Sequence, residues 1–278
     1  MQRPVKQSLI GLVFLAIIVL LFLGLRLLST PIVTCFDNIQ NQNEAGVDCG
    51  GICAKLCTPS LAPLKIKDTW LINAGSTAAG MSYDVLFLVT NSNPSFGSGS
   101  TVYQLNLYDQ TGVVVSAQSG DFYILPGQTK YVYFALPTIK TIATRAEVKI
   151  LSADWQLASN DFSQNLRLVV KNYDYHLSTQ PGRAAELSGT MRNDSDLALE
   201  QVDLVVVLFE NGVPVAANQT GVRTSSPKQD NGFLVFWQTP PVSGTPERVD
   251  IEVGTNIFQD ANFIRRYGQP EKFQQFYP

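Results

Sequence analysis

Residues 101–109, Thr-Val-Tyr-Gln-Leu-Asn-Leu-Tyr-Asp, alternate between apolar and polar side chains. Tyr103, Leu105 and Leu107 would share one face of an extended chain, because successive side chains of a strand point to opposite faces. From Lys65 onward, similar short runs rich in Val, Tyr, Phe and Thr are separated by clusters of Gly, Pro, Asn and Ser. This part of the sequence therefore predicts strands joined by turns.

Residues 202–210, Val-Asp-Leu-Val-Val-Val-Leu-Phe-Glu, are a second such run, with Leu204, Val206 and Leu208 predicted to face inward. Residues that correspond in the two halves lie 100 to 102 positions apart: Leu107 and Leu208, Gly112 and Gly212, Phe134 and Phe236, Val148 and Val249, Ile150 and Ile251. So steady an offset predicts an internal duplication. Each copy has the length and about the seven strands of an immunoglobulin-like β-sandwich. We assign the copies to residues 64–156 and 163–260.

Turn signals support this division into strands. Glu210-Asn211-Gly212 predicts a type I′ hairpin, because Asn and Gly accept the positive φ that this turn requires. Gln110-Thr111-Gly112 is a looser version of the same signal, and Leu125-Pro126-Gly127 predicts another turn.

The N-terminal region has a different character. Leu9 to Leu25 contains seventeen successive residues without a charged or strongly polar side chain, about the length that crosses the hydrocarbon core of a bilayer. We predict a transmembrane helix at residues 8–29. Arg3 and Lys6 precede it, which favours a cytoplasmic N-terminus at residues 1–7 and extracytoplasmic C-terminal domains. A cleaved segment or a lipid-modified Cys35 are the alternatives.

Composition excludes several classes of function. The chain of 278 residues has 20 Lys and Arg against 23 Asp and Glu, a net charge of −3, so it offers no broad cationic surface for nucleic acid. Its single histidine, His176, makes most hydrolase and metalloenzyme mechanisms improbable.

All four cysteines, Cys35, Cys49, Cys53 and Cys57, lie in the segment 35–57. An even number of cysteines outside the membrane predicts two disulfides, with three possible pairings that the sequence leaves open. A zinc site is the alternative, although the spacing departs from paired C-x2-C ligands.

The same segment is rich in oxygen ligands, which are Asp37, Asn41, Asn43, Glu44 and Asp48. Calcium prefers such ligands, so a calcium site is one hypothesis. The other is that these side chains bond to nearby backbone amides and shape the turns between the disulfides. No further cofactor is predicted.

Two resemblances rest on these motifs. Cys35-Phe-Asp-Asn-Ile-Gln-Asn to Val47-Asp-Cys-Gly-Gly-Ile-Cys53 resembles a small extracellular cysteine-rich module, in which Asn38 replaces a common glycine. Leu107-Tyr-Asp-Gln-Thr-Gly-Val-Val114 and Leu208-Phe-Glu-Asn-Gly-Val-Pro-Val215 resemble the FxLYD family of bacterial extracytoplasmic sandwich domains. Asn91, Asn93-Pro94 and Leu125-Pro126-Gly127 fit that pattern in the first copy; in the second, Asn193 fits, with Pro227 and Asp230-Asn231-Gly232 where Pro-Gly would stand. The combination is similar to envelope proteins of Parcubacteria-like bacteria. The resemblance implies a fold and an exported location, and assigns no catalytic residue.

The sequence contains no recognisable catalytic set. His176 is predicted to be an ordinary surface or turn residue, and Asp154, Asp161, Asp174 and Glu186 are predicted to be scattered and solvated. No glycine-rich phosphate loop with a lysine occurs in the sequence. These observations predict a protein that is not an enzyme.

Two segments are candidates for contact with a partner protein. Residues 91–100 are predicted to form a long mobile loop that carries Phe96, since loops on rigid sandwiches often bind partners. The C-terminal tail, residues 261–278, combines aromatic and cationic groups, with Phe263, Arg265, Arg266 and Tyr267 as the candidate residues. In either case the alternative is that the aromatic residues pack on the protein itself.

Together, these features predict a mainly β protein with an N-terminal transmembrane helix, a small disulfide-rich module and two tandem immunoglobulin-like β-sandwiches. The predicted function is that of a single-pass, membrane-anchored binding or scaffold protein outside the cell membrane. Its predicted partners are the lipid bilayer and an envelope protein or a second copy of itself. Alternatives are a calcium-responsive sensor or assembly factor, and an enzyme that processes envelope glycans.

Overall fold

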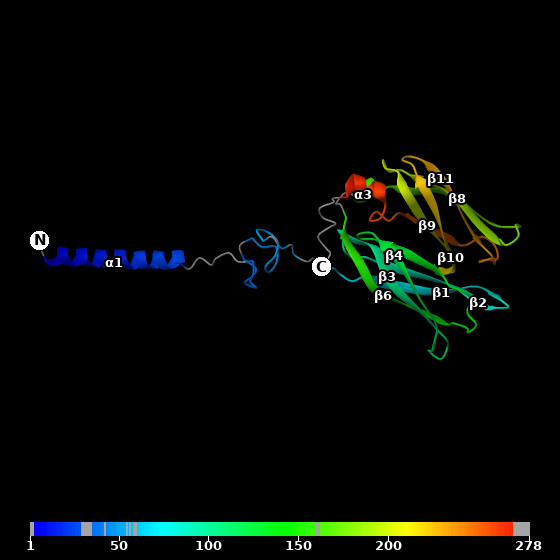
Figure 1. Cartoon of the computed structure of the whole chain (residues 1–278), viewed down its shortest axis with the longest axis horizontal. Helices are drawn as coiled ribbons and strands as arrows, with labels where there is room; N and C mark the ends of the chain where they lie inside the picture. The colour runs from blue at the N-terminus through cyan, green and yellow to red at the C-terminus, as the bar shows by residue number, and fades with distance from the viewer. Residues whose placement is uncertain are drawn as a thin grey trace. The chain divides into compact units, whose positions relative to one another are not determined.

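A computed structural model describes residues 3–28, 35–41, 43–53, 55, 57, 60–158 and 162–268. Asp161 and the C-terminal residues 269–278 lie outside the described residues. The chain divides into two units, Met1–Ser60 and Leu61–Pro278, drawn in Figure 1.

The first unit begins with the helix α1, Arg3–Leu28, which is followed by the cysteine module. The large apolar side chains from Ile10 to Leu25 are exposed along this helix. Among the residues that the structure describes, no helix combines the length and apolar character needed to cross a membrane. The predicted transmembrane helix is therefore not confirmed.

The second unit starts with a β-sandwich built from two three-stranded antiparallel sheets. One sheet has the order β1 (Lys65–Thr77), β2 (Gly80–Thr90), β5 (Thr129–Ala135), and the other has the order β4 (Val114–Ile124), β3 (Phe96–Tyr108), β6 (Arg145–Leu157). Between them lies a core that includes Val85, Phe87, Tyr103, Leu105 and Leu107. The inward face predicted for the run 101–109 is confirmed.

A second sandwich repeats this topology. Its sheets have the orders β11 (Asp230–Trp237), β8 (Ala185–Asn193), β7 (Leu168–Leu177), and β10 (Val213–Ser225), β9 (Leu199–Glu210), β12 (Arg248–Gly254). Short helices α2 (Phe162–Asn165) and α3 (Ala261–Tyr267) flank it. Leu204, Val206 and Leu208 are fully buried in its core, as predicted. The mainly β prediction is confirmed, with six described strands in each half instead of about seven.

The two sandwiches share a buried asparagine at the same place. The Asn91 side-chain amide donates to the carbonyls of Phe96 (2.7 Å) and Leu125 (2.9 Å). The Asn193 amide donates to the carbonyls of Leu197 (2.8 Å) and Ser225 (3.0 Å). Each asparagine thus ties the end of its strand to the backbone near the start of the next strand and near the end of the strand after it, which explains why both copies have this residue.

The turn that follows also recurs, which corrects the comparison made from sequence. Gly127 has φ +65° and Lys228 has φ +59°, and each follows a proline, Pro126 or Pro227. Pro227-Lys228 therefore occupies the place of Pro126-Gly127, and the Asp230-Asn231-Gly232 segment begins the next strand instead.

Strand register corrects three of the predicted equivalences. Phe134 pairs with Val85 and Val235 pairs with Leu187, so Val235 is the counterpart of Phe134. Phe236 lies one residue further and is exposed on the opposite face of its strand, because a shift of one residue reverses the face.

The other two corrections concern the last strand of each sandwich. Val148 pairs with Leu105 but Val249 pairs with Leu208, the counterpart of Leu107. The true counterpart of Val148 is thus Ile251, two residues beyond the predicted one. The counterpart of Ile150 is likewise Val253 instead of Ile251.

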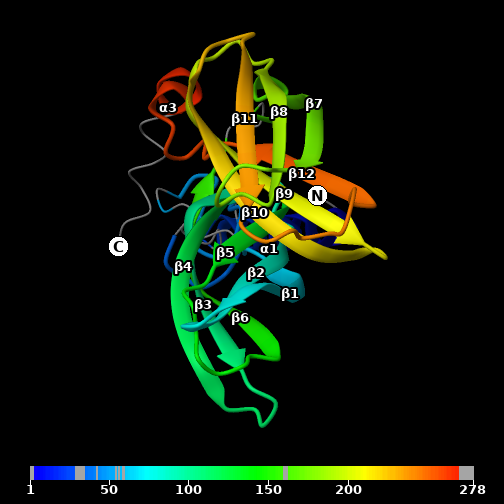
Figure 2. The ribbon, with the colours of Figure 1, turned by 90° about the vertical axis from the view of Figure 1, so that its right-hand side faces the viewer.

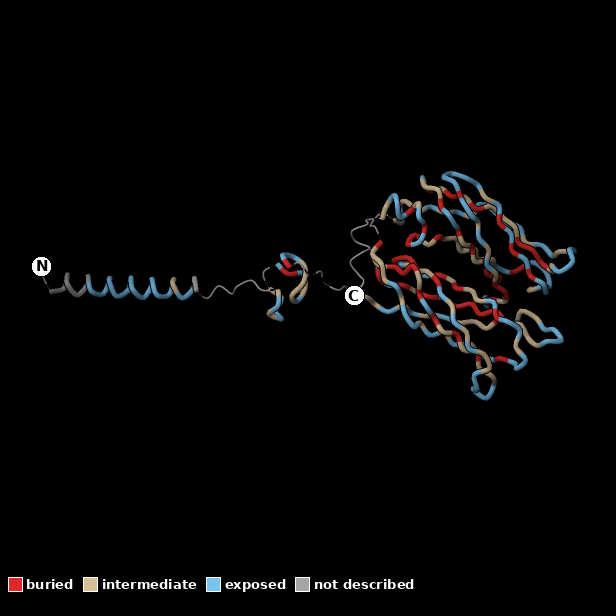
Figure 3. The backbone as a smooth tube through the Cα atoms, in the orientation of Figure 1, coloured by how far each residue is buried: buried red, intermediate tan, exposed pale blue. Residues whose placement is uncertain are grey.

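The two sandwiches pack against each other through outer faces of their sheets. The contact contains Ile72 and Leu86 from the first sandwich and Val207, Phe209 and Ala217 from the second, all buried. Figure 2 shows β1 and β2 beside β10, and in Figure 3 buried segments run along the strands of both sandwiches. Polar bonds add to the contact: the Tyr131 amide donates to Glu252 Oε2 (2.9 Å) and the Tyr131 hydroxyl to Asp250 Oδ2 (3.3 Å).

Candidate functional site

The cysteine module contains two disulfides, as predicted, and the structure decides the pairing as Cys35–Cys53 and Cys49–Cys57. Three polar residues of the module, Asn38, Asn43 and Asp48, have positive φ. Asn38 thus adopts the left-handed conformation that glycine favours and asparagine tolerates. Crosslinks of this kind stabilise a short segment mainly by restricting its unfolded chain.

The candidate calcium ligands form hydrogen bonds within the module. Asp48 accepts from the amides of Asp37 (2.9 Å) and Asn38 (3.0 Å), and Glu44 Oε2 accepts from the amides of Asn41 (3.3 Å) and Asp48 (3.2 Å). These bonds support the interpretation that the acidic side chains shape turns. Calcium binding stays a prediction.

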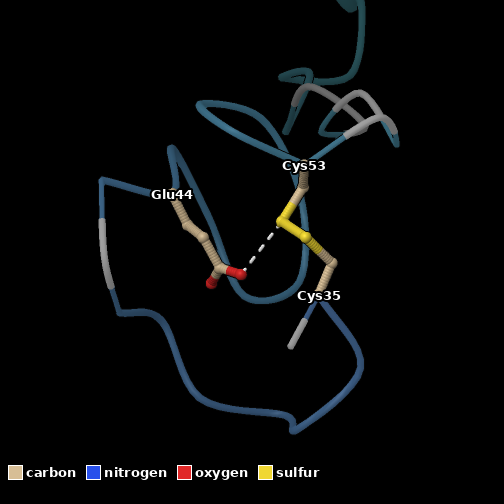
Figure 4. A group of neighbouring side chains, drawn as sticks. All are labelled: Cys35, Glu44 and Cys53. Carbon is tan, nitrogen blue, oxygen red and sulfur yellow. Dashed lines mark hydrogen bonds between the residues drawn. A yellow bond between two sulfur atoms is a disulfide. The ribbon is translucent and has the colours of Figure 1, made fainter. Parts of the chain in front are cut away.

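Within the described residues, the one group of three or more metal-ligating side chains is Cys35, Glu44 and Cys53. Glu44 Oε1 lies 3.1 Å from Cys53 Sγ, the contact dashed in Figure 4. The sulfurs of Cys35 and Cys53 form a disulfide, so Cys53 Sγ carries no proton to donate to Glu44. Because thiolates are the zinc ligands that cysteine provides, the oxidised module does not offer the predicted alternative zinc site.

The segment predicted to be a mobile loop, residues 91–100, is a strand from Phe96 onward. Phe96 is half-buried and pairs with Leu157 of β6. Gly97 and Gly99 serve close packing, because a Cβ at either position would lie within 3 Å of Phe258 of the second sandwich. The predicted loop is therefore shorter than expected, because residues 96–100 belong to β3 and their glycines allow close packing of Phe258. Partner contact through Phe96 stays a prediction.

The described part of the C-terminal tail is the helix α3. Asp260 caps it by accepting from the Phe263 amide at 2.9 Å. Phe263 is only 5% exposed and packs with Leu125, Ile257 and Phe258, so its ring contacts the protein itself. Arg265 and Arg266 are exposed and Tyr267 is half-buried. Partner contact through these three residues stays a prediction.

Ionisable groups collect at one end of the contact between the sandwiches. The buried Lys130 ammonium lies 3.7 Å from the centre of the Tyr123 ring. Burial lowers the pKa of Lys130, while the nearby Glu252 and Asp203 carboxylates oppose that change. Burial and the same two carboxylates hold the pKa of Tyr123 well above its usual value. These groups adjoin a cleft of about 430 Å³ lined by Tyr123, Asp203 and other polar residues.

Two acidic side chains of this first cleft, Asp260 and Glu200, have structural partners. Asp260 accepts from the amides of Phe263 and Glu200 (2.7 Å), and Glu200 in turn accepts from the Ala261 amide (3.2 Å). Together these bonds hold α3 against β9. These two carboxylates therefore serve to join elements of the fold.

A second cleft, of about 560 Å³, lies between the β1–β2 hairpin and strands β10 and β11. Asp84 of β2 lines it and is only 9% exposed. The Tyr133 hydroxyl donates a hydrogen bond to Asp84. Burial raises the pKa of Asp84 to about 6, against a smaller lowering by Tyr133. A buried carboxyl that lines a cleft is a functional-site candidate on physical grounds.

Sequence reasoning missed Asp84. It lies in the run Tyr83-Asp84-Val85-Leu86-Phe87, and an isolated acidic residue inside an apolar strand was the available signal, since buried acidic side chains are rare. Glu186 differs from its prediction in the same way: it is 7% exposed instead of solvated. By contrast, His176 is exposed near the end of β7, beside Asp174 (3.2 Å).

Comparisons with known proteins give little further information. No family model and no curated protein matches the chain. Among solved structures, a transglutaminase of red sea bream is similar, with 11% identity and a TM-score of 0.21. That match covers 69% of this chain, but the chain spans only 29% of the transglutaminase. A score this low carries no argument about fold or activity.

Proposed function

We propose that this protein is a membrane-anchored, extracytoplasmic binding or scaffold protein of the cell envelope and that it is not an enzyme. The observation that carries the proposal is the pair of disulfides in the module that follows the apolar N-terminal helix. Disulfides persist in oxidising compartments outside the cytoplasm. A location beyond the membrane is therefore the natural place for the module and for the domains after it.

The proposed anchor is α1, supported by its exposed apolar side chains. A helical surface of this kind in water would be an aggregation hazard unless lipid or protein covered it. Arg3 and Lys6 precede the apolar run, and the flank beyond Pro31 contains acidic residues such as Asp37 and Glu44. This charge asymmetry favours a cytoplasmic N-terminus.

The proposed binding role depends on the shape of the second unit. Two sandwiches with a shared apolar contact present loops and outer sheet faces to possible partners. Such scaffolds place function on surfaces while their cores supply stability. At the first cleft, Asp260 and Glu200 hold α3 against β9, which supports a structural role for these carboxylates over a catalytic one.

The test is fractionation and protease protection in cells that express the full chain. We expect the protein to resist alkaline carbonate extraction and added protease to digest residues 61–278 in intact cells. Ile17→Arg with Leu20→Arg should release the protein from membranes, because charge in the hydrocarbon is costly. Val113→Arg, at an exposed turn position, is the control and should remain in the membrane fraction.

Two results would overturn the proposal. One is carbonate-soluble protein with an intact N-terminus. The other is mass spectrometry of alkylated protein that shows four free thiols in the native host, which would place the module in a reducing compartment.

A further inference from the structure

The carboxylate of Asp84 lacks a cationic partner. None of the ion pairs among the described residues includes Asp84. The described lining of its cleft contains no Lys, Arg or His. Among the residues that the structure describes, its side-chain hydrogen-bond partner is the Tyr133 hydroxyl, which is neutral. A carboxyl group that is only 9% exposed thus sits in a cleft without a charge to balance it.

In the second sandwich, the corresponding carboxylate has a cationic partner. Asp84 precedes Asn91 by seven residues, and Glu186 precedes Asn193 by the same number. Both lie on the middle strand of a three-stranded sheet, paired with Ala135 or Phe236. Glu186 is also buried, but it accepts from Ser178 Oγ (2.8 Å) and lies 3.6 Å from Arg183 Nη1. At equivalent positions, one carboxylate has an arginine from its own chain and the other faces a cleft.

Buried charges in proteins are normally paired or become neutral. The cleft leaves room for a group that would supply the missing charge. Its walls suit a cationic side chain with an aliphatic stem, because Ile72, Val215 and Pro240 line it beside the hydroxyl groups of Ser82 and Thr220. Long cationic side chains commonly pack their methylene groups on apolar surface while the charged end bonds to polar groups.

We propose that this cleft binds a guanidinium or ammonium group, which forms with Asp84 the ion pair that Arg183 forms with Glu186. The group would come from an arginine or lysine side chain of a partner polypeptide or from a free small amine. The inference rests on the binding role proposed above and is independent of the proposed membrane location.

The primary experiment is calorimetric titration of the purified full chain in detergent with N-acetyl-arginine amide. N-acetyl-citrulline amide is the matched control, because it has nearly the same shape and no charge. We expect heat of binding with the arginine compound at pH 7.5 and none with the citrulline compound. At pH 5.0 the affinity should fall by about tenfold, since a carboxyl with a pKa near 6 is then mostly protonated.

Asp84→Asn should abolish binding and its pH dependence. Asp68→Asn, which neutralises an exposed acid on the neighbouring strand β1, should leave both unchanged. A direct readout that needs no variant is the carboxyl 13C resonance of Asp84, whose apparent pKa should fall when the arginine compound is added. Tyr133, the other titratable group that faces Asp84, ionises far above this range.

Two further probes identify the source of the cation. If the peptide acetyl-Gly-Arg-Gly-amide binds at least tenfold more tightly than N-acetyl-arginine amide, the site recognises a polypeptide. If spermidine binds as tightly as the peptide, the site recognises small amines. Absence of binding at millimolar arginine compound, equal binding of the citrulline compound, or undiminished binding by a folded Asp84→Asn variant would each overturn the inference. None of these results would alter the fractionation expected for the anchored protein.

Discussion

Asp84 and Gly127 are two residues whose type matters because of where the fold places them. Asp84 carries a charge into a region that apolar side chains dominate, between Val85 and the contact residues Ile72 and Leu86. Gly127 adopts a backbone conformation that side chains with a Cβ rarely adopt. A substitution at either position should change the free energy of unfolding measurably.

Asp84→Asn should stabilise the protein at neutral pH. The folded state raises the pKa of Asp84 from 3.8 to about 6, so the favourable contribution of the neutral acid is complete below pH 4. It is lost as the pH rises to 6, at a cost of about 3 kcal/mol. Thermal unfolding should show that the variant is more stable than the parent at pH 7.5. We expect a difference of about 2 kcal/mol, less than the full cost because the parent structure adjusts around the charge. At pH 4 the two proteins should be nearly equal in stability. Asp68→Asn should change little at either pH, and a variant less stable than the parent at pH 7.5 would contradict the cost assigned to the buried charge.

Gly127→Ala should lower the free energy of unfolding by about 1 kcal/mol, the usual cost of a left-handed conformation for a residue with a Cβ. A Cβ at Gly127 would meet no atom within 4 Å, so the whole effect comes from φ +65°. Gly244 also has open space but no positive φ, which makes Gly244→Ala the matched control. Urea denaturation of both variants measures the difference; equal midpoints would show that the turn relaxes without cost.

At the scale of elements, β9 differs from its counterpart β3 in the number of faces it buries. On β3, Gln104 and Asn106 alternate with core residues and are half-buried or less. On β9, the corresponding positions are Val205 and Val207, and they join the contact with the first sandwich. The sequence signal for this contact is the uninterrupted apolar run Leu204 to Phe209, since a strand buried on both faces loses its alternation.

Val207→Asn places in β9 the residue that β3 has at the equivalent position, Asn106. Val207 is fully buried in the contact between the sandwiches, so the amide would lose water without a designed partner. We expect a loss of about 2 to 4 kcal/mol. Calorimetry should show a lower or divided unfolding transition, whereas Asn106→Val should leave a single transition. An unchanged transition in Val207→Asn would mean that the contact contributes little to stability.

At the scale of the whole molecule, each sandwich uses a different outer face for the contact, and the equivalent face of the other sandwich is not used. The contact joins an outer face of the first sandwich, with Leu86, to an outer face of the second, with Val207. On the unused faces, Ser188 stands at the position equivalent to Leu86, and Asn106 stands at the position equivalent to Val207. Polar residues at these positions disfavour repetition of the same contact with a further copy of the chain, which would otherwise produce an open stack.

The disulfides restrict only the cysteine module, since both crosslinks lie within residues 35–57. We therefore expect a reducing agent to leave the main thermal transition, which reports the sandwiches, unchanged within about 1 °C. Limited proteolysis should become faster within residues 35–57, because two loops lose their closure. A large shift of the main transition on reduction would show that the module and the sandwiches stabilise one another.

The pattern of residues alone determined the β class, the duplication, the inward faces of β3 and β9, and the presence of two disulfides. Each of these depends on local periodicity or on counting, which the sequence contains directly. It could not determine the pairing of the cysteines, the burial of Asp84 and Glu186, or the shifts of one and two residues between the copies. Those depend on which side chains meet across strands and between sandwiches, and only the tertiary structure brings such distant residues together.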